Sequence, residues 1–560
     1  MSKYISRIIK IGNLSLGGDS PVRIQSMTST DTMDTEATVQ QSIRMIEAGC
    51  EMVRITAQGM REAVNLAVIK DELKTRGYDI PVIADIHFNP KAAEVAARIV
   101  DKVRINPGNY IDKNHGKVDY SEEVYLAELK KIKERIKPLI LICKEYGTTI
   151  RIGSNHGSLS ERILARFGNT PEGMVESALE YVRICRELDF HNIVLSMKSS
   201  NVKIMVLSNR LLVRKMQDEG MNYPIHLGVT EAGDAEDGRI KSAAGIATLL
   251  ADGIGDTIRV SLTEDPEYEI PVAKAIVSYF GNRSDSEPLE KMVFSYGRRI
   301  SAEIEKTGGG QVPVVILNSE NPDRSKLNEQ FLPDYIFIEG NSLTQLINGE
   351  QGPGYVTSKP EGDLVIDKNE KDKIIVLDTD MSSPVRDVKQ SINTVIENGV
   401  KNPIVLKRRY KNLLDDEFII RTAGEFAYLL IDGLLDGIWI ESDNQTLDFI
   451  AAVSFGILQA TGDRISKTEY IACPSCGRTL FNIQDTLQKI KAKTAHLKGL
   501  KIGVMGCIVN GPGEMADADY GYVGTGKGKI TLYKRQQIIR KNIDEKDAVG
   551  ELVKLISHDL

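Results

Sequence analysis

Short β-rich segments alternate with amphipathic helical segments eight times between Pro21 and Gly281, and this rhythm constrains the fold more than any other feature of the chain. Eight β/α repeats in about 250 residues match the length of a closed (β/α)8 TIM barrel. A doubly wound open sheet is the alternative, but its usual Gly-x-Gly-x-x-Gly is missing after the first segment. The expected strands are Val22–Thr28, Met52–Thr56, Val82–His87, Lys102–Asn106, Thr149–Gly153, Ile193–Lys198, Ile225–Glu231 and Thr257–Ser261.

Helical patterns, with apolar residues three or four positions apart, separate these strands. The residues before Pro21 are expected to form a short hairpin that closes the bottom of the barrel. The expected helices include Thr35–Ala48, Met60–Thr75, Pro90–Val100, Pro171–Glu187, Val202–Glu219 and Ile240–Ala251.

Polar residues stand at the carboxyl ends of the expected strands, where TIM-barrel active sites lie. An ordinary surface or salt-bridged position explains any one of them, but five cations at one register would repel one another unless an anion lay among them. A diphosphate suits this set, because guanidinium groups match phosphate oxygens in pairs. The strand-end residues are Arg54, Asp85, His87, Arg104, Asn106, Arg151, Asn155, Lys198, Glu231, Arg259 and Ser261.

The rhythm changes after Ser284, and we divide the chain into residues 1–281, 282–465 and 466–560. The middle part reads as a separate α/β domain and as a candidate for a second barrel-like unit. It carries no compact catalytic signature, and Lys407, Arg408 and Arg409 are expected to form a solvated turn after a strand. Its expected strands are Val314–Leu317, Tyr335–Ile338, Ile374–Asp378, Ile404–Leu406 and Gly437–Glu441, and its expected helices are Ser382–Asn398, Leu413–Ile431 and Thr446–Thr461.

Three of the six cysteines lie in the last part, at Cys473, Cys476 and Cys507. Two close cysteines and a third further on are typical of a metal site. Glu514 follows Cys507 across a Gly-Pro-Gly turn and is a candidate fourth ligand, since no histidine lies beside the cysteines. The cysteines alone support a structural zinc ribbon and an iron–sulfur cluster equally. The other cysteines are isolated and are expected to be buried.

The last part, residues 466–560, is expected to be a small α+β domain. A lysine-rich helix is predicted at Thr486–Leu497, and strands are predicted at Lys501–Met505, Tyr520–Val523 and Lys529–Tyr533. Gly524–Gly528 has the composition of a phosphate-binding loop, but it joins two strand-like segments. A hairpin turn is therefore the better interpretation.

Composition limits the partners and the location. The net charge of −7 argues against a general nucleic-acid or anionic-membrane surface. No apolar run approaches the ~20 residues of a membrane span. The first ten residues lack an apolar core with a cleavage site, and the cysteines are not arranged as disulfide pairs, so we expect a cytoplasmic protein.

Specific motifs resemble the 4-hydroxy-3-methylbut-2-enyl diphosphate synthase family, an enzyme family of the methylerythritol phosphate route to isoprenoids. The segments Ala472–Phe481 (Ala-Cys-Pro-Ser-Cys-Gly-Arg-Thr-Leu-Phe) and Gly506–Glu514 (Gly-Cys-Ile-Val-Asn-Gly-Pro-Gly-Glu) are similar to its cluster-binding segment. The middle part resembles the insert of the longer, three-domain, plant-like form. Six barrel segments are also similar: Pro21–Thr28, Ile83–Phe88, Val103–Asn109, Arg151–Ser158, Gly228–Gly233 and Ile258–Asp265.

The resemblance implies a reductive ring opening: 2-C-methyl-D-erythritol 2,4-cyclodiphosphate takes two electrons and two protons, loses water and becomes (E)-4-hydroxy-3-methylbut-2-enyl diphosphate. It implies a [4Fe–4S] cluster held by Cys473, Cys476, Cys507 and Glu514, with Glu514 displaced during the reaction and Glu231 as the proton donor. Ferredoxin or flavodoxin would supply electrons, and the protein would be a monomer or homodimer. Arg54, Arg104, Arg151, Lys198 and Arg259 would hold the diphosphate with Asn155 and Ser261, while Asp85, His87 and Asn106 would orient hydroxyl groups.

Two other function classes remain open. One is a non-redox TIM-barrel transferase on a diphosphate substrate, with a structural zinc; the other is an iron–sulfur carrier without catalysis. A carrier does not need a cradle of five cations, which favours the synthase. Anaerobically purified protein that is brown and contains iron and sulfide would exclude the zinc protein, and turnover would exclude the carrier. The middle part is expected to act as a spacer that lets the last part reach the barrel of its own chain.

Overall fold

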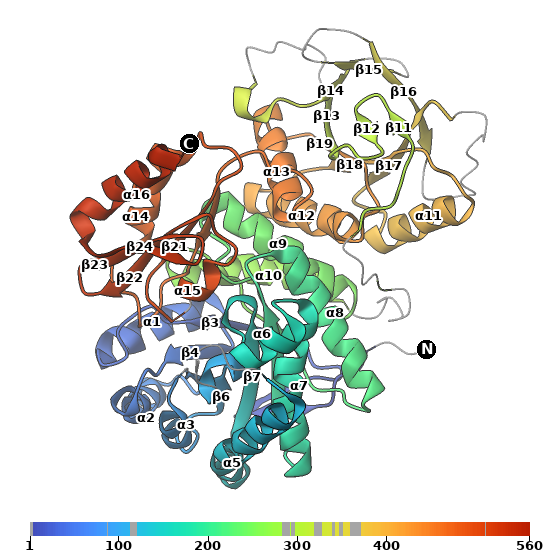
Figure 1. Ribbon diagram of the computed structural model, residues 1–560. Helices are drawn as coiled ribbons and strands as arrows, with labels where there is room; N and C mark the ends of the chain where they lie inside the picture. Colours follow the sequence, from blue (N-terminus) through green and yellow to red (C-terminus); the bar gives the residue numbers. More distant parts are fainter. Residues whose placement is uncertain are drawn as a thin grey trace.

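The computed structural model describes residues 4–86, 88–111, 120–282, 292, 297–318, 327–338, 342–345, 351–358, 371–509 and 511–559. It contains an eight-stranded sheet, a closed barrel of seven strands and a five-stranded sheet, in chain order. Figure 1 shows the first barrel with the second barrel against one part of it and the C-terminal sheet against another.

The first sheet is a closed parallel barrel. Its strands run in the order β8-β7-β6-β5-β4-β3-β10-β9, and a parallel bridge between Leu195 and Ile225 joins β8 to the chain just before β9. This closure confirms the barrel and excludes the open sheet. The strands are β3 (Arg23–Met27), β4 (Met52–Thr56), β5 (Val82–Asp85), β6 (Lys102–Ile105), β7 (Thr149–Asn155), β8 (Ile193–Lys198), β9 (His226–Leu227) and β10 (Thr257–Ile258).

The last two strands are much shorter than predicted. The chain after Leu227 leaves the sheet, and Glu231 and Gly233 both have left-handed backbones, with φ of 49° and 98°. A strand cannot continue through such residues. The hairpin of β1 (Ile9–Ile11) and β2 (Leu14–Leu16) is confirmed before Pro21.

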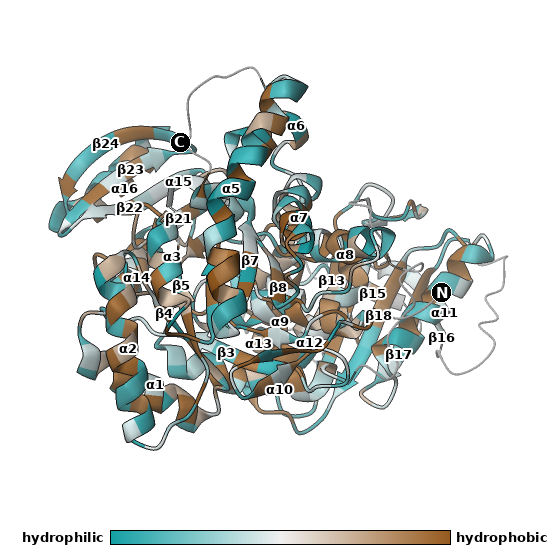
Figure 2. Ribbon diagram, turned by 90° about the horizontal axis from the view of Figure 1, so that it is seen from below, coloured by the Kyte–Doolittle hydropathy of each residue, from teal (hydrophilic) through white to brown (hydrophobic). Residues whose placement is uncertain are grey.

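The helices surround the barrel. The predicted bounds are confirmed for α1 (Thr35–Ala48), α2 (Met60–Thr75) and α7 (Pro171–Glu187). Figure 2 shows hydrophilic and hydrophobic residues mixed along peripheral helices such as α2 and α5, as expected for helices with one buried face. The others are α3 (Pro90–Ala96), α4 (Pro107–Tyr110), α5 (Glu122–Tyr146), α6 (Glu161–Phe167), α8 (Val202–Asp218), α9 (Ala235–Ala251) and α10 (Glu269–Phe280).

Helix α9 begins five residues before the predicted start at Ile240. Its first turn carries Glu236 and Asp237, whose charges suit the positive end of the helix dipole. Lys467 lies 2.5 Å from Asp237 and fixes this turn against the C-terminal part of the chain.

The middle part folds into a second closed barrel, as its barrel-like reading predicted. Strand β15 runs antiparallel to both of its neighbours, β14 and β16, whereas the other neighbouring pairs of this barrel are parallel. Its strands are β13 (Val314–Asn318), β14 (Tyr335–Phe337), β15 (Ser342–Gln345), β16 (Gln351–Ser358), β17 (Ile374–Asp380), β18 (Ile404–Tyr410) and β19 (Gly437–Ser442), and its helices are α11 (Val385–Glu397), α12 (Asp415–Ile431) and α13 (Leu447–Ala460).

The interpretation of Lys407–Arg409 as a solvated turn is wrong. All three residues lie within β18, and the side chain of Arg408 is fully buried. Its guanidinium donates to both carboxylate oxygens of Glu425, at 2.5 and 3.0 Å. Glu425, a buried residue of α12, is therefore the ion-pair partner of Arg408, and the sequence around Arg408 gave no sign of it.

A buried ion network joins the two barrels. Helix α9 packs along α12, and Arg210 on α8 donates to Asp252 at 2.8 Å and to Asp432 at 2.5 Å. Lys389 on α11 lies 2.9 Å from Asp432, and these ionic side chains are at most 1% exposed. The two barrels therefore share one continuous interior.

We expect Arg210→Met to lower the free energy of unfolding by about 3–5 kcal/mol, because it leaves the buried carboxylates of Asp252 and Asp432 without their main partner. Urea titration followed by circular dichroism would measure the change. Arg44→Met is the matched control: Arg44 is 52% exposed and pairs with Glu267 at 2.8 Å, so its loss should cost at most about 1 kcal/mol. Equal losses in both variants would contradict the stabilising role of the network.

The C-terminal sheet has the order β20-β21-β22-β23-β24, with β20–β22 parallel and β22–β24 antiparallel. Gly524–Gly528 lies at the β22–β23 hairpin, which confirms a turn rather than a phosphate loop. The elements are β20 (Glu469–Ala472), β21 (Lys501–Met505), β22 (Tyr520–Gly526), β23 (Lys529–Lys534), β24 (Gln537–Asp544), α14 (Ile483–Thr494), α15 (Gly511–Glu514) and α16 (Glu545–Asp559).

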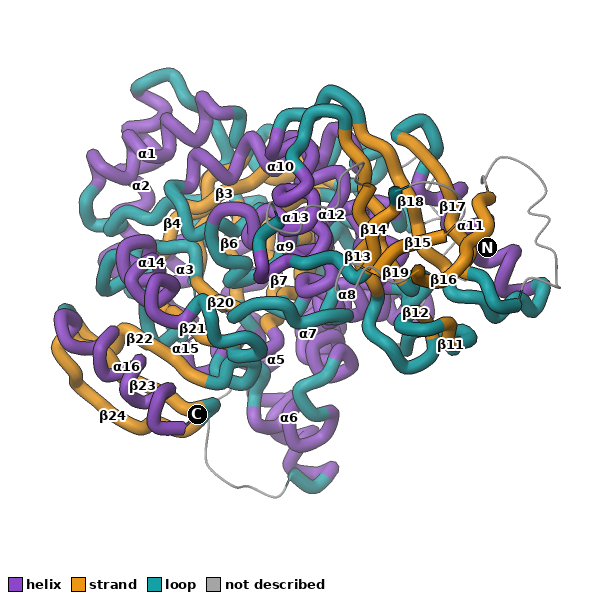
Figure 3. The backbone as a smooth tube through the Cα atoms, turned by 90° about the horizontal axis from the view of Figure 1, so that it is seen from above, coloured by secondary structure: helices purple, strands orange, loops and turns teal. Residues whose placement is uncertain are grey.

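The two faces of this sheet have different neighbours. Leu487 of α14 and Leu552 of α16 pack in one core with Ile502 and Tyr522. Met515, just after α15, packs on the opposite face with Met505 and Val523, and α15 contacts the turn after β7. Figure 3 shows the sheet beside the first barrel and apart from the second. The α15 face is therefore the one turned to the barrel.

Among the described residues, none of the helices combines the length and the apolar character that crossing a membrane requires.

Candidate active site

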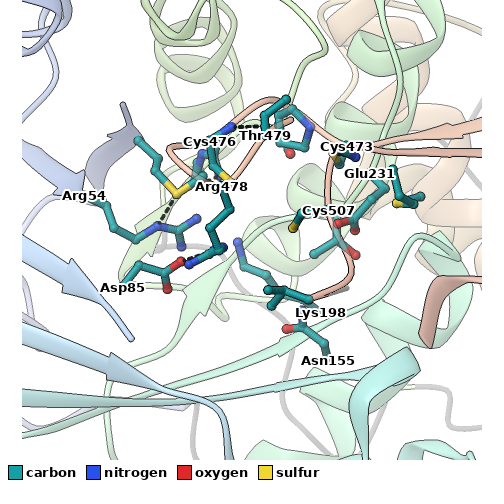
Figure 4. A pocket seen from close by; sticks show the side chains of 18 of the residues that line it. Arg54, Asp85, Asn155, Lys198, Glu231, Cys473, Cys476, Arg478, Thr479 and Cys507 are labelled. Atoms are coloured by element: carbon teal, nitrogen blue, oxygen red, sulfur yellow. Dashed lines mark hydrogen bonds and ion pairs between the residues drawn. The ribbon is translucent and has the colours of Figure 1, made fainter. Parts of the chain in front are cut away.

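A cavity lies where the carboxyl ends of the first barrel's strands meet the cysteine loops of the C-terminal part. Side chains from both parts point toward one another across it (Figure 4). Twelve of the fifteen predicted site residues line it: Arg54, Asp85, Arg104, Arg151, Asn155, Lys198, Glu231, Arg259, Ser261, Cys473, Cys476 and Cys507. One chain thus supplies both walls.

The cations of the cavity are buried close together, and the pKa values of most of them fall as a result. Burial, together with Arg259 and Arg104, lowers the pKa of Arg54 to about 9 despite the nearby Asp85. Burial also lowers the pKa of Arg104, and it lowers those of Arg151 and Lys198 well below their usual ranges. Such a site favours an anion, because an anion stabilises the charged form of every one of these groups.

The cations differ in how they are paired. Arg259 donates to both carboxylate oxygens of Glu269, at 3.1 and 2.9 Å, and Arg104 lies 3.3 Å from Asp85. In the described part of the chain, Nε and Nη1 of Arg151 have no hydrogen-bond partner, and Lys198 forms no ion pair. Arg151 and Lys198 are therefore the donors most available to a ligand.

Glu231 is 2% exposed and has a left-handed backbone with φ of 49°. The next residue, Ala232, forms a parallel bridge with Ala472, which immediately precedes Cys473. Both the barrel and the C-terminal sheet therefore fix the position of this carboxyl group. Strained backbone in a non-glycine residue is common at functional sites, where the surrounding structure maintains it.

The three cysteines of the C-terminal part are half-buried, form no disulfide in the described structure and line one cavity. Burial, followed by the neighbouring Cys476 and Cys507, raises the pKa of Cys473, and the Gly506 N–H donates to its sulfur at 3.2 Å. Within the described ranges, no three His, Cys, Asp or Glu side chains are grouped closely enough to hold a metal ion. Three thiols of this kind are donors that suit an iron–sulfur cluster as well as a zinc ion.

Three predicted site residues are not among the cavity's lining residues. Glu514 is 3% exposed, and burial, followed by Glu231 and Asp517, raises its pKa well above the usual range. Asn106 caps α4, accepting from the Gly108 N–H at 3.1 Å, and donates to Ser158 at 2.7 Å. His87 lies outside the described residues.

Arg478 is the main lining residue that the sequence reasoning missed. It extends from the loop after Cys476 into the cavity and donates to Asp85 at 2.9 Å, while its Nε and Nη1 atoms have no hydrogen-bond partner among the described residues. Although burial opposes its charge, Cys476 and Asp85 raise its pKa. Its position two residues after a predicted ligand was the available signal.

The Arg478–Asp85 pair is a direct bond between the C-terminal loop and the barrel, so we expect strong coupling between them. Arg478→Met and Asp85→Asn should each lower kcat/KM, and the double variant should lose much less than the two losses combined. A double-mutant cycle should give a coupling free energy of about 2–4 kcal/mol. The control is Gln58→Ala. It also removes a contact between the barrel and the cysteine loop, an exposed hydrogen bond of 3.0 Å from the Gln58 side chain to the Gly477 carbonyl. Additive losses in the cycle would contradict the pairing.

Further contacts hold the C-terminal part over the barrel. Lys241 lies 2.7 Å from Glu469, and Lys491 pairs with Asp234. Gly157 and Gly513 bring two backbones together: a Cβ on Gly157 would lie 2.6 Å from the Gly513 carbonyl carbon. The remaining cavity measures about 70 Å³, well below the roughly 300–1,000 Å³ of ligand pockets. A ligand of diphosphate size therefore requires side chains or the C-terminal part to move.

Two family models match the chain. The GcpE TIM-barrel domain matches residues 6–274, and the GcpE protein C-terminal domain matches residues 469–558. They cover the two parts of the chain whose side chains line the cavity.

Curated relatives are similar over nearly the whole chain. Proteins of Parabacteroides distasonis and Porphyromonas gingivalis, both named 4-hydroxy-3-methylbut-2-en-1-yl diphosphate synthase (flavodoxin), are 48% and 44% identical. Each alignment covers 99% of this chain, with 98% and 97% of the relatives. Among solved structures, dihydropteroate synthase of Burkholderia cenocepacia is similar to 49% of this chain, over 98% of its own length, at 11% identity and a TM-score of 0.34.

Proposed function

The chain belongs to the GcpE family, and from that membership we propose that it is a 4-hydroxy-3-methylbut-2-enyl diphosphate synthase. It opens the ring of 2-C-methyl-D-erythritol 2,4-cyclodiphosphate with two electrons and two protons and releases water and (E)-4-hydroxy-3-methylbut-2-enyl diphosphate. The observation that carries this proposal is the cavity in which buried barrel cations face the thiols of Cys473, Cys476 and Cys507.

The barrel cations bind the diphosphate. Arg151 and Lys198 make the principal contacts, because neither is neutralised by a neighbouring carboxylate in the described structure. Arg54 and Arg104 add charge beside Asp85, and Arg259 is oriented by Glu269. Asn155 and Ser261 line the same cavity and bind by hydrogen bonds, while Asp85 orients the substrate's hydroxyl groups.

The acid is Glu231. Its carboxyl group lies in the cavity on the side of the cysteine loops and is almost inaccessible to water. It gives its proton to the oxygen that leaves the substrate, which departs as water. A carboxyl group positioned against the substrate can transfer a proton in this way.

Cys473, Cys476, Cys507 and Glu514 would hold a [4Fe–4S] cluster, with Glu514 as the weakly held ligand. When bound, the cluster supplies single electrons at low potential, which side chains cannot provide. Arg478 lies beside these ligands and joins their loop to Asp85. The electron donor is flavodoxin, in agreement with the printed names of the relatives.

Substrate binding should be coupled to proton uptake. Burial, then Arg151 and Arg54, lowers the pKa of Lys198 in the free site, and a bound diphosphate should raise it again. The complex therefore holds more protons than the free enzyme, and affinity should fall as pH rises above the lowered pKa of the free amine.

Calorimetry in two buffers of different ionisation enthalpy would measure this uptake. Lys198→Met should bind more weakly and take up fewer protons, whereas Lys411→Met, at the mouth of the second barrel, should match the wild type. Equal heats in both buffers at every pH would contradict the coupling.

The test of the function itself is anaerobic turnover of the cyclodiphosphate with reduced methyl viologen as the electron source. The reconstituted protein should contain iron and sulfide and should form the linear diphosphate. Brown protein without turnover would indicate a carrier, and a colourless active protein with zinc would indicate a non-redox enzyme.

A further inference from the structure

A basic groove lies on the C-terminal part, outside the active-site cavity. It runs between α14 and α16, encloses about 1080 Å³, and has Tyr522 of β22 among its walls. Five cations and three acids line it: Lys489, Lys493, Arg540, Lys546 and Lys554, with Glu545, Asp547 and Glu551.

The charges of this groove are poorly balanced. Arg540 and Lys554 both pair with Glu551. Lys489, Lys493 and Lys546 are exposed, and none has an ion pair within the described ranges. Unpaired cations lining one depression produce a positive potential that attracts an acidic partner.

The groove belongs to a basic part of an acidic protein. Residues 466–560 contain 15 Lys and Arg and 10 Asp and Glu, which gives +5, whereas the whole chain carries −7. The remainder of the chain therefore carries −12. This distribution of charge favours the approach of an acidic macromolecule to the C-terminal part rather than to the barrels.

A short aromatic path leads from the groove to the cysteine loops. The ring of Tyr522 meets the ring of Phe481 edge-on, with centroids 5.2 Å apart. A Cβ on Gly524 would lie 3.2 Å from the Phe481 ring and 2.5 Å from the Gly506 carbonyl, so these groups are in close contact. Gly506 in turn donates to Cys473 and precedes Cys507. Two aromatic side chains, Tyr522 and Phe481, and two glycines, Gly524 and Gly506, thus lie between the groove and the thiols.

The groove is open to solvent in this structure, in which the C-terminal part lies over the barrel mouth. It lies on the α14 and α16 face of the sheet, whereas the opposite face, with α15, contacts the barrel. Lys491 of α14 pairs with Asp234 of the barrel but does not line the groove, so a partner in the groove can leave this contact in place.

We propose that this groove is the docking surface for the electron donor, an acidic carrier protein of the flavodoxin class. The proposal rests on the proposed function, which needs two electrons for each turnover. Each docked flavodoxin hydroquinone gives one electron through the Phe481 side of the cysteine loops and leaves as the semiquinone, so two visits complete one reduction. The positive groove attracts the acidic carrier, and the aromatic path places its electron close to the thiol-held site.

The test compares two electron sources in a charge-reversal variant. Lys489→Glu/Lys493→Glu/Lys546→Glu should raise the KM for reduced flavodoxin roughly tenfold or more and weaken its dependence on salt, because rim charges act on association. Turnover with reduced methyl viologen should stay at the wild-type rate, since this small reductant needs no protein docking surface.

The control is Lys498→Glu/Lys527→Glu/Arg535→Glu, which makes the same charge change at exposed positions of the same part that do not line the groove. Its KM for flavodoxin should change far less. An equal rise in both variants would show only a net-charge effect and would overturn the proposal, as would an unchanged KM in the groove variant. Loss of methyl viologen turnover in the wild type would instead count against the proposed function.

Discussion

Replacing Glu231 with glutamine should leave the affinity for the cyclic diphosphate almost unchanged and lower kcat by about 10²–10⁴-fold, the usual contribution of a positioned acid. Glutamine keeps the size and the hydrogen-bonding shape of the side chain but has no acidic proton. In the proposed site, the barrel cations that line the same cavity hold the diphosphate, so binding should survive. Anaerobic steady-state kinetics and a direct binding titration would separate the two quantities.

A suitable control is Glu441→Gln at the carboxyl end of β19, where the second barrel has a similar strand-end carboxylate. Its kinetics should match those of the wild type. Normal turnover by Glu231→Gln would remove this residue from the mechanism, and Asp85, His87 or a water molecule would then become the candidate acid.

Replacing Cys507 with serine should reduce iron and sulfide after anaerobic reconstitution to a small fraction of the wild-type content and abolish turnover. Serine is a poor ligand for a cluster that thiolates hold, and Cys507 lines the cavity with the other two half-buried thiols. Cys473→Ser and Cys476→Ser should behave in the same way. Glu514→Ala should assemble more iron than these variants but turn over slowly, because solvent can replace a weak oxygen ligand.

Cys143→Ser provides the matched control, since Cys143 is buried within the barrel helices and far in sequence from the other thiols. It should retain iron, sulfide and activity, apart from a modest loss of stability. Full iron content in Cys507→Ser would exclude this residue as a ligand.

The sequence predicted the first barrel well because the signals for it are local. The spacing of apolar residues identifies each strand and helix separately, and the polar residues at the strand ends all fall at one face of the barrel. It failed where a distant partner decides the structure. Arg408 looks like a surface residue until Glu425 is brought against it, and Arg478 becomes a site residue only when its loop meets Asp85. Strand β16 contains Gly352, Pro353 and Gly354, which typically indicate a turn, and only closure of the second barrel explains its pairing.

The contact between Gly157 and Gly513 sets how closely the cysteine loops can approach the barrel mouth. Two main chains meet there without intervening side chains, so the limit does not depend on which rotamers the neighbours adopt. When the C-terminal part closes over the barrel, the distance between the cysteine loops and the barrel mouth should therefore be the same in every catalytic cycle. It should also vary little between individual molecules. Replacing either glycine with alanine would add one methyl group and lengthen the distance between the cysteine loops and the barrel mouth. Because this change alters no charge and no ligand, its effect on the rate of turnover would report on that distance alone.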